Sequence, residues 1–166
     1  LVVELPPMMQ GIIDDFYQRP IASEGKIDGK TWAGDVGLPG PDKGRGGRYL
    51  ILPPDYKGKV PAGYYAFRSR TYGVMVFLRG FFKDPKDLSE PVKNLEKTRI
   101  YPLGKKASAP AMKFPNASQM PADLLYPKDG SAFDLLHRYI DAEYPGTADM
   151  EMRGMLAAIG IVKGKP

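Results

Sequence analysis

The stretch Asp35–Pro54, DVGLPGPDKGRGGRYLILPP, decides the fold. It begins as a loop rich in glycine and proline and ends in a short apolar strand, Tyr49–Leu52, which two prolines terminate. Lysine and arginine side chains beside glycine amides can hold a phosphate or a carboxylate. Nucleotide-binding loops of this kind lead into a helix, however, and this loop leads into a strand. The stretch therefore favours a tight turn at a sheet edge, and an anion site with Lys43, Arg45 and Arg48 is the alternative.

The composition supports a turn-rich β structure. The chain has 166 residues, including 19 glycines and 17 prolines, and 43% of its residues are hydrophobic. Glycine and proline exceed the roughly 12% of average usage and show no repeating period, which argues against a helical bundle. The absence of cysteine excludes disulfides, thiolate metal sites and cysteine nucleophiles.

Charge and hydropathy limit the partners. The net charge of +5 is mild, and the chain lacks the tight basic stripe of nucleic-acid-binding proteins, so no nucleic acid is expected. No run reaches the ~18 apolar residues that a membrane helix needs, so no membrane span is expected.

Two patterns of secondary structure follow one another along the chain. Strands are expected at residues 1–5, 49–52, 64–68 and 74–79, and the last two should form a hairpin. Residues 12–17 fit either a strand or a helical turn, residues 22–47 should form a loop, residues 84–97 contain a short helix and residues 99–101 form a strand.

The last forty residues are helical in pattern. Ser131 should cap a helix, with Asp134 completing a capping box, and Thr147 should cap a second helix. The expected fold class is therefore mainly β with a C-terminal α part. We place a β-sandwich region at residues 1–126 and an α-helical hairpin at residues 127–166.

Candidate catalytic groups are few. His137 is the only histidine, and without cysteines it leaves only carboxylates for a metal site, so no metal or cofactor is expected. No serine lies in a nucleophile-elbow pattern. Asp14 and Asp15 are adjacent acids, but neighbours on a strand point to opposite faces and could not act together. No catalytic residue is assigned.

The segment Tyr64–Tyr72 alternates aromatic residues with arginines. Such a face can stack on sugars or bases, although the same pattern is ordinary for a strand with one buried and one solvated face. If a face of this chain binds a ligand, the candidate residues are Arg68, Arg70, Tyr72 and Arg79.

Three runs carry a resemblance to a known family. They are GDVGLPGPDKGRGGRYLILPPDYKGKVPAGYYAFRSRTYGVMVFLRGFFKD, LEKTRIYPLGKK and MRGMLAAIGIVKGKP. They closely resemble the bacterial family known as domain of unknown function 1254 (DUF1254), whose members usually continue into a DUF1214 domain. The resemblance implies an immunoglobulin-like β-sandwich, an α-helical connector and a jelly-roll. It also implies that this chain is a fragment, with an incomplete sandwich.

The resemblance brings no catalytic residues with it. Because many members look exported, a periplasmic or exported location is expected, and a cytoplasmic one otherwise. We expect a non-catalytic binding or assembly module of an exported two-domain β-protein, with a small anionic or sugar ligand as a candidate. The alternative is a hydrolase acting on a carbohydrate or envelope substrate. Missing strands would leave open edges, to be paired by the rest of the protein or by a second copy.

Overall fold

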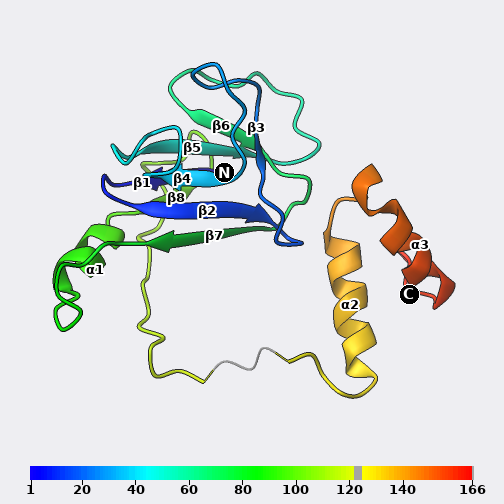
Figure 1. Ribbon diagram of the computed structural model, residues 1–166. Coiled ribbons are helices and arrows are strands. Elements are labelled where there is room, and N and C mark those ends of the chain that lie inside the picture. The colour runs from blue at the N-terminus through cyan, green and yellow to red at the C-terminus, as the bar shows by residue number, and fades with distance from the viewer. Residues whose placement is uncertain (122–124, 166) are drawn as a thin grey trace. The chain divides into compact units, whose positions relative to one another are not determined.

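The computed structural model describes residues 1–121 and 125–165, and the chain divides into two compact units, Leu1–Phe114 and the residues from Pro115 onward (Figure 1). The strands of the first unit are β1 (Val2–Leu5), β2 (Gln10–Asp15), β3 (Ala22–Ser23), β4 (Asp35–Gly37), β5 (Gly47–Leu52), β6 (Tyr65–Arg68), β7 (Val74–Arg79) and β8 (Arg99–Tyr101). This unit also contains the short helix α1 (Ser89–Leu95). The second unit contains α2 (Ser131–Ala142), the single 3-10 turn η1 (Thr147–Asp149) and α3 (Met150–Ala158).

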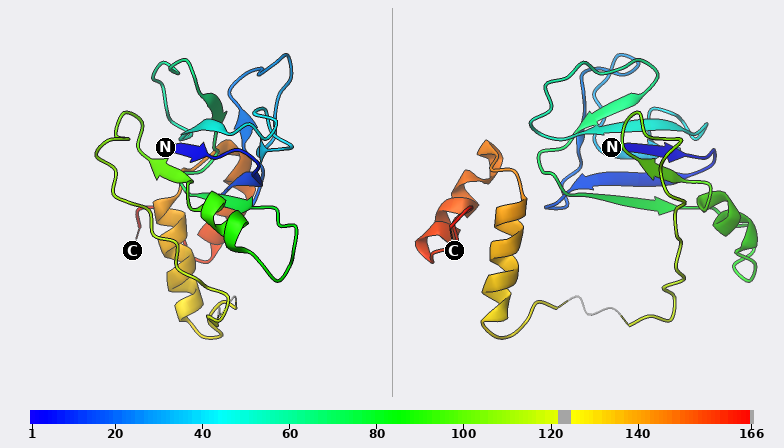
Figure 2. Two further views of the ribbon diagram at one scale, coloured as in Figure 1. Left: turned by 90° about the vertical axis from the view of Figure 1, so that its left-hand side faces the viewer. Right: turned by 180° about the vertical axis from the view of Figure 1, so that it is seen from behind.

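The strands form an open β-sandwich. Sheet A has the strand order β3-β6-β5-β1-β8, and sheet B has the order β4-β2-β7. All neighbours are antiparallel except β5 and β6, which run parallel. Figures 1 and 2 show the two sheets as separate layers. The predicted fold class, mainly β with a C-terminal α part, is confirmed.

The core lies between the two sheets. Tyr49 and Phe67 of sheet A meet Ile13 and Val36 of sheet B, and all four side chains are fully buried. Burying a large apolar side chain contributes roughly 1.5–3 kcal/mol, so this layer is the main source of stability. A smaller cluster on the outer face of sheet A, which includes Leu50, is covered by the segment that follows β5.

The predicted hairpin of residues 64–68 and 74–79 is wrong. β6 pairs with β5 and β3 in sheet A, whereas β7 pairs with β2 in sheet B. The short turn between β6 and β7 therefore carries the chain from one layer to the other. Both strands still present alternate apolar residues to the core, which is why their pattern looked like that of a hairpin.

Two further differences are local. The predicted loop at residues 22–47 contains the two short strands β3 and β4. At the start of α2 the predicted capping box is absent, because Gly130 holds the N-cap position and makes no side-chain cap. Instead, Asp129 Oδ1 accepts hydrogen bonds from the backbone N–H of Ser131 at 3.0 Å and from its hydroxyl at 2.6 Å.

Of the other helices, α1 follows the prediction and α3 differs from it at its start. Pro91 lies in the first turn of α1, where its missing N–H costs nothing. The predicted cap at Thr147 is absent, because Thr147 is the first residue of η1 and α3 begins only at Met150, in both cases without a side-chain cap hydrogen bond. Within the described residues, no helix combines the length and the apolar character that crossing a membrane would require.

Candidate binding site

Arg68, one of the predicted ligand-binding residues, is tied to the protein itself. Its Nε and Nη2 donate to the carboxylate of Glu24 at 2.8 and 2.9 Å. Its Nη1 donates to the backbone carbonyls of Pro53 and Tyr56 at 3.2 and 3.0 Å. The hydrogen bonds from Arg68 hold the pKa of Glu24 below its ordinary value. Arg68 therefore anchors the loop that follows β5.

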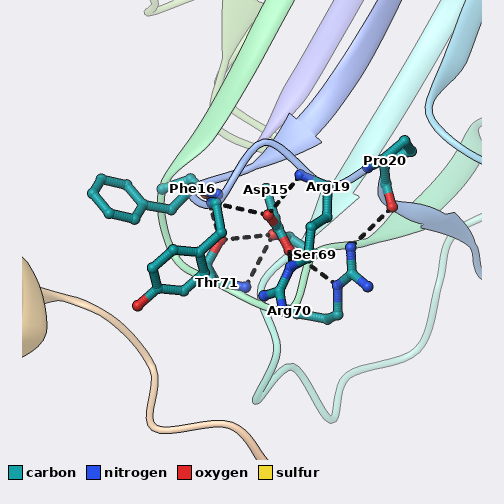
Figure 3. Close-up of polar contacts among 9 residues, drawn as sticks. Asp15, Phe16, Arg19, Pro20, Ser69, Arg70 and Thr71 are labelled. Carbon is teal, nitrogen blue, oxygen red and sulfur yellow. Dashed lines mark hydrogen bonds and ion pairs between the residues drawn. The ribbon is translucent and has the colours of Figure 1, made fainter. Parts of the chain in front are cut away.

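Arg70 belongs to a polar cluster around the buried carboxylate of Asp15 (Figure 3), which we call the Asp15 cluster. Arg70 Nε and Arg19 Nε donate to Asp15 Oδ2 at 3.0 and 2.9 Å. The backbone N–H groups of Tyr17 and Arg19 donate to Oδ1 at 2.9 and 3.1 Å. Arg70 also donates to the carbonyl of Pro20. The carboxylate thereby fastens the turn after β2 to the turn between β6 and β7.

Hydroxyl groups complete this junction. The backbone N–H of Phe16 donates to Thr71 Oγ1 at 2.8 Å, and Thr71 Oγ1 donates to the carbonyl of Gly73 at 2.7 Å. Ser69 Oγ accepts a hydrogen bond from the backbone N–H of Thr71 at 3.1 Å. The geometry is that of a structural clamp between the two sheets.

The remaining two predicted residues lie elsewhere. The hydroxyl of Tyr72 donates to Asp55 Oδ2 at 2.8 Å. The guanidinium of Arg79 lies 5.7 Å from the ring centroid of Phe77 on the exposed side of β7. The structure thus does not bring Arg68, Arg70, Tyr72 and Arg79 together on one face.

Asp14 differs sharply from its neighbour Asp15. It is 8% exposed, and its Oδ1 makes no hydrogen bond within the described residues. Burial, together with the nearby charge of Asp15, raises the pKa of Asp14. The two carboxyl groups have different surroundings and do not form a catalytic pair.

The glycine-rich loop is organised by its own acid, Asp42, which is fully buried. Asp42 Oδ2 accepts a hydrogen bond from the backbone N–H of Gly46 at 2.9 Å, and Oδ1 accepts one from the hydroxyl of Tyr49. That hydroxyl also accepts a hydrogen bond from the N–H of Gly37 at 3.3 Å. Arg45 Nε donates to the Asp42 carbonyl at 3.2 Å. An internal carboxylate therefore takes one of the amides that the alternative, an anion site, would have needed.

Lys43 is part of the same turn. Its φ of 51° places it in the left-handed region, as does the φ of 78° at Gly46. A Cβ on Gly46 would lie 2.7 Å from the carbonyl oxygen of Leu5, so the loop passes too close to β1 for a larger residue. The structure contains the tight turn that the sequence favours, but this turn leads into β5, the middle strand of sheet A, and not to a sheet edge.

Two of the predicted residues line pockets: Tyr72 lines a small one of about 150 Å³, and Arg48 lines a larger one. The larger pocket, about 470 Å³ in volume, opens where β1 and β5 meet the segment before β6, and we call it the Arg48 pocket. Its lining residues are Glu4, Leu5, Gly46, Gly47, Arg48, Gly63, Tyr64 and Tyr65.

The position of Arg48 follows from sheet register. Glu4 of β1 is paired with Arg48 of β5 on one side and with Arg99 of β8 on the other. Directly opposite residues of antiparallel strands share a face, so these three side chains form a row on the outer face of sheet A. The guanidinium carbon of Arg48 lies 4.7 Å from the ring centroid of Tyr64, at the end of the row. No residue in the described part of the chain accepts a hydrogen bond from this guanidinium.

Glu4 is held by other partners. Lys106 Nζ donates to Glu4 Oε1 at 2.8 Å, and the hydroxyl of Tyr101 donates to Oε2 at 2.8 Å. The hydrogen bond from Lys106 and the one from Tyr101 keep the pKa of Glu4 below its ordinary value, although burial opposes them. Burial and the bond to Glu4 raise the pKa of Tyr101 to about 12. The charge of Arg48 also helps to lower the pKa of Glu4, but in the described part of the chain Glu4 hydrogen-bonds to Lys106 and Tyr101 and not to Arg48.

Two glycines leave space in the Arg48 pocket, one beside the guanidinium of Arg48 and one beside the ring of Tyr65. Gly63 has a φ of +84°, and a Cβ there would lie 3.1 Å from Arg48 Nη2. A Cβ on Gly47 would lie 2.8 Å from the ring of Tyr65. The roles of Tyr64 and Glu4 were missed at the sequence level, because the register between β1 and β5 joins them and no local motif does.

The described residues contain no group of three histidine, aspartate or glutamate side chains that could hold a metal ion. His137 lies in the second unit, where its Nε2 is 3.2 Å from the carbonyl oxygen of Val162. The same nitrogen lies 3.8 Å from Asp141 Oδ2, one turn along α2, and no serine hydroxyl is among the hydrogen-bond partners of His137 in the described residues.

The fold and the pocket place this chain among β-sandwich domains that carry a small pocket lined by an arginine and tyrosines. Comparison with known proteins then gives the family. The model of the family described as "Protein of unknown function (DUF1254)" matches residues 1–102, and the chain therefore belongs to this family. The comparison with curated proteins finds no match.

One solved structure shows the same fold. It is the crystal structure of the VPA0106 protein from Vibrio parahaemolyticus, similar with a TM-score of 0.58 and 18% sequence identity. The similarity covers 99% of this chain and 38% of that chain. This chain thus spans well under half the length of the protein that it resembles.

Proposed function

We propose that this chain is a non-catalytic binding module whose Arg48 pocket takes a small anionic ligand, with an acidic sugar as the first candidate. One observation carries the proposal: a guanidinium held over an aromatic ring faces a pocket of about 470 Å³ without a hydrogen-bonded acid. Arginine binds carboxylates and phosphates through two parallel N–H groups, so its vacant donors favour that ligand chemistry.

The rest of the pocket suits a sugar that carries a carboxylate. Tyr64 and Tyr65 supply aromatic surface, and Glu4 supplies an acceptor that a ligand hydroxyl could reach. The hydrolase alternative gains no support from this geometry. Of the residues that line the pocket, only Glu4 has a carboxyl group, and its pKa is lowered, whereas a general acid needs a raised one.

The assembly part of the expected function is also a proposal. The candidate partners are a second copy of the chain or the remaining part of a longer protein with a DUF1214 domain in an exported location. The long edge strand β7 supports pairing with another strand.

The test is calorimetric titration of the chain with galacturonate, galactose and inorganic phosphate. We expect galacturonate to bind more tightly than galactose, and Arg48→Gln to weaken galacturonate binding about tenfold or more, the usual value of a hydrogen bond to a charged group. Arg45→Gln is the matched control, because Arg45 is exposed in the same loop but does not line the pocket. Equal binding of the two sugars, or equal losses in the two variants, would contradict the proposal. If only phosphate binds, the proposed ligand is a simple inorganic anion and not an acidic sugar.

A further inference from the structure

The edges of the two sheets are unequal. In the described part of the chain, β3 and β8 stand at the edges of sheet A, and β4 and β7 stand at those of sheet B. β3 has two residues, and β4 and β8 have three each, whereas β7 has six. Short edge strands are a usual protection against pairing with other chains. β7 lacks that protection.

The outer side of β7 is unpaired. All six of its residues are in register with β2, from Gln10 opposite Arg79 to Asp15 opposite Val74. Beyond β2, no described residue hydrogen-bonds to the backbone of β7. A strand of this length presents a row of N–H and C=O groups that another strand can pair with. In Figure 1, β7 lies at the margin of its sheet.

The side chains of β7 also lack the charges and prolines that usually keep an edge strand from pairing with another chain. The strand reads VMVFLR, with no proline, no lysine and no charge before its last residue. Met75 is 43% exposed and Phe77 is 50% exposed on the outer face, while Val74, Val76 and Leu78 are only partly buried on the inner face. Natural monomers place charges or prolines on such edges. An uncharged, half-exposed edge strand indicates a surface that is covered in the assembled protein.

We propose that β7 pairs antiparallel with β7 of a second copy of this chain, about a two-fold axis at Val76. Residues whose numbers add to 152 then stand opposite each other. Met75 faces Phe77 of the second copy on the outer face, and Val74 faces Leu78 of the second copy on the inner face. The result is a continuous six-stranded sheet, β4-β2-β7-β7-β2-β4.

The choice of a second copy follows from the strand itself. The apolar residues of β7 alternate in the same way when the strand is read from either end. In this register Met75 of one copy therefore lies opposite Phe77 of the other, which is a favourable sulfur–aromatic contact. Arg79 falls opposite Gly73 of the second copy, so no two like charges meet in this register. The inference does not depend on the Arg48 pocket, which lies in the other sheet.

The first measurement is the mass of the full chain in solution by light scattering over a range of concentrations. We expect a dimer that dissociates on dilution. The double variant Met75→Lys, Phe77→Lys places four lysines in the seam and should be monomeric with an unchanged circular dichroism spectrum, since both side chains point outward. A wild-type chain that is monomeric at every concentration would overturn the proposal, and so would a double variant that still dimerises.

Cysteine cross-linking tests the register. Because the chain contains no cysteine, a disulfide can form only between introduced residues. A mixture of Met75→Cys and Phe77→Cys chains should cross-link under mild oxidation, since directly opposite Cβ atoms lie about 4.5–5.5 Å apart. Each variant alone should cross-link far less, because its cysteines are diagonal. Lys57→Cys, on the exposed loop after β5, is the control. Cross-linking of the mixture no better than that of the control would overturn the pairing.

Discussion

The Asp15 cluster and the Arg48 pocket both combine arginine with a carboxylate, but the first holds the fold together and the second leaves an arginine exposed to a ligand. In the Asp15 cluster, a fully buried carboxylate accepts hydrogen bonds from two arginines, and both become structural. In the Arg48 pocket, the nearby acid Glu4 is hydrogen-bonded to Lys106, and Arg48 contacts the ring of Tyr64 and attracts Glu4 without a hydrogen bond to it. The difference between the two sites teaches that the other partners of the neighbouring acid decide whether the arginine is held by the protein or can reach a ligand.

The largest expected effect is at Asp15. Replacing it by alanine leaves two guanidinium groups without their acceptor and releases the turn after β2, so Asp15→Ala should cost about 3 kcal/mol of unfolding free energy. Asp55→Ala is the matched control, because Asp55 accepts one hydrogen bond from Tyr72 at the surface and should cost about 1 kcal/mol or less. Urea unfolding measures both variants. Equal costs would show that the Asp15 cluster is no clamp.

The next effect is at the glycine-rich loop. Tyr49→Phe removes a hydroxyl that donates to buried Asp42 and accepts from Gly37, and it should cost about 2 kcal/mol, since a buried charged acceptor loses its partner. Tyr72→Phe removes an exposed hydroxyl and should cost well under half of that. Thermal unfolding compares the two. A larger loss at Tyr72 would contradict the central role of Asp42 in this loop.

A smaller effect separates the two kinds of arginine directly. Arg48→Gln should change stability by at most about 0.5–1 kcal/mol, the value of an exposed cation–π contact. The same substitution at Arg70 removes an ion pair to a buried carboxylate and should cost more. Urea unfolding of the two arginine-to-glutamine variants compares their losses of unfolding free energy for the same chemical change. If Arg48→Gln proved the costlier change, Arg48 would be structural and the pocket would lose its free donor.

The smallest expected effect, at Asp14, has the opposite sign. Because the pKa of Asp14 is raised in the folded chain, its charged form disfavours folding above that pKa, and this penalty disappears as the pH falls and the carboxyl takes up its proton. Asp14→Asn should therefore be no less stable than the native chain at pH 7. Its relative advantage should shrink as the pH approaches 4. Unfolding at several pH values measures this, and a clear loss of stability at pH 7 would contradict it.

Local patterns predicted the elements well and their pairing poorly. The strand Tyr49–Leu52, the strands around Phe67 and Val76, and both C-terminal helices were all recognisable from periodicity, although the caps predicted for the two helices are absent. The hairpin prediction failed because alternation tells which residues face a core and not which sheet a strand joins. Nothing short-range shows that the turn between β6 and β7 crosses from one layer to the other.

The candidate site shows the same limit. Arg48 was identified from the charge of the glycine-rich loop, but Glu4 and Tyr64 reach it only through pairing of β1 with β5 and through the loop before β6. The partners of Arg68 and Arg70 lie 44 and 55 residues away along the chain. An arginine beside aromatic residues therefore looks like a ligand site until its distant acid is known.

The place of β1 in sheet A has a consequence for how the protein is made. β1 is flanked by β5 and β8, and the bond from Tyr101 to Glu4 joins residues 97 positions apart. During synthesis at 5–20 residues per second, β1 waits about 5–20 s for its last neighbour. Pairings this distant in sequence also slow folding in the test tube. Until β8 arrives, β1 can pair only with β5, and its other edge stays open to pairing with other chains. We therefore expect the yield in cells to rise when a chaperone shields that edge.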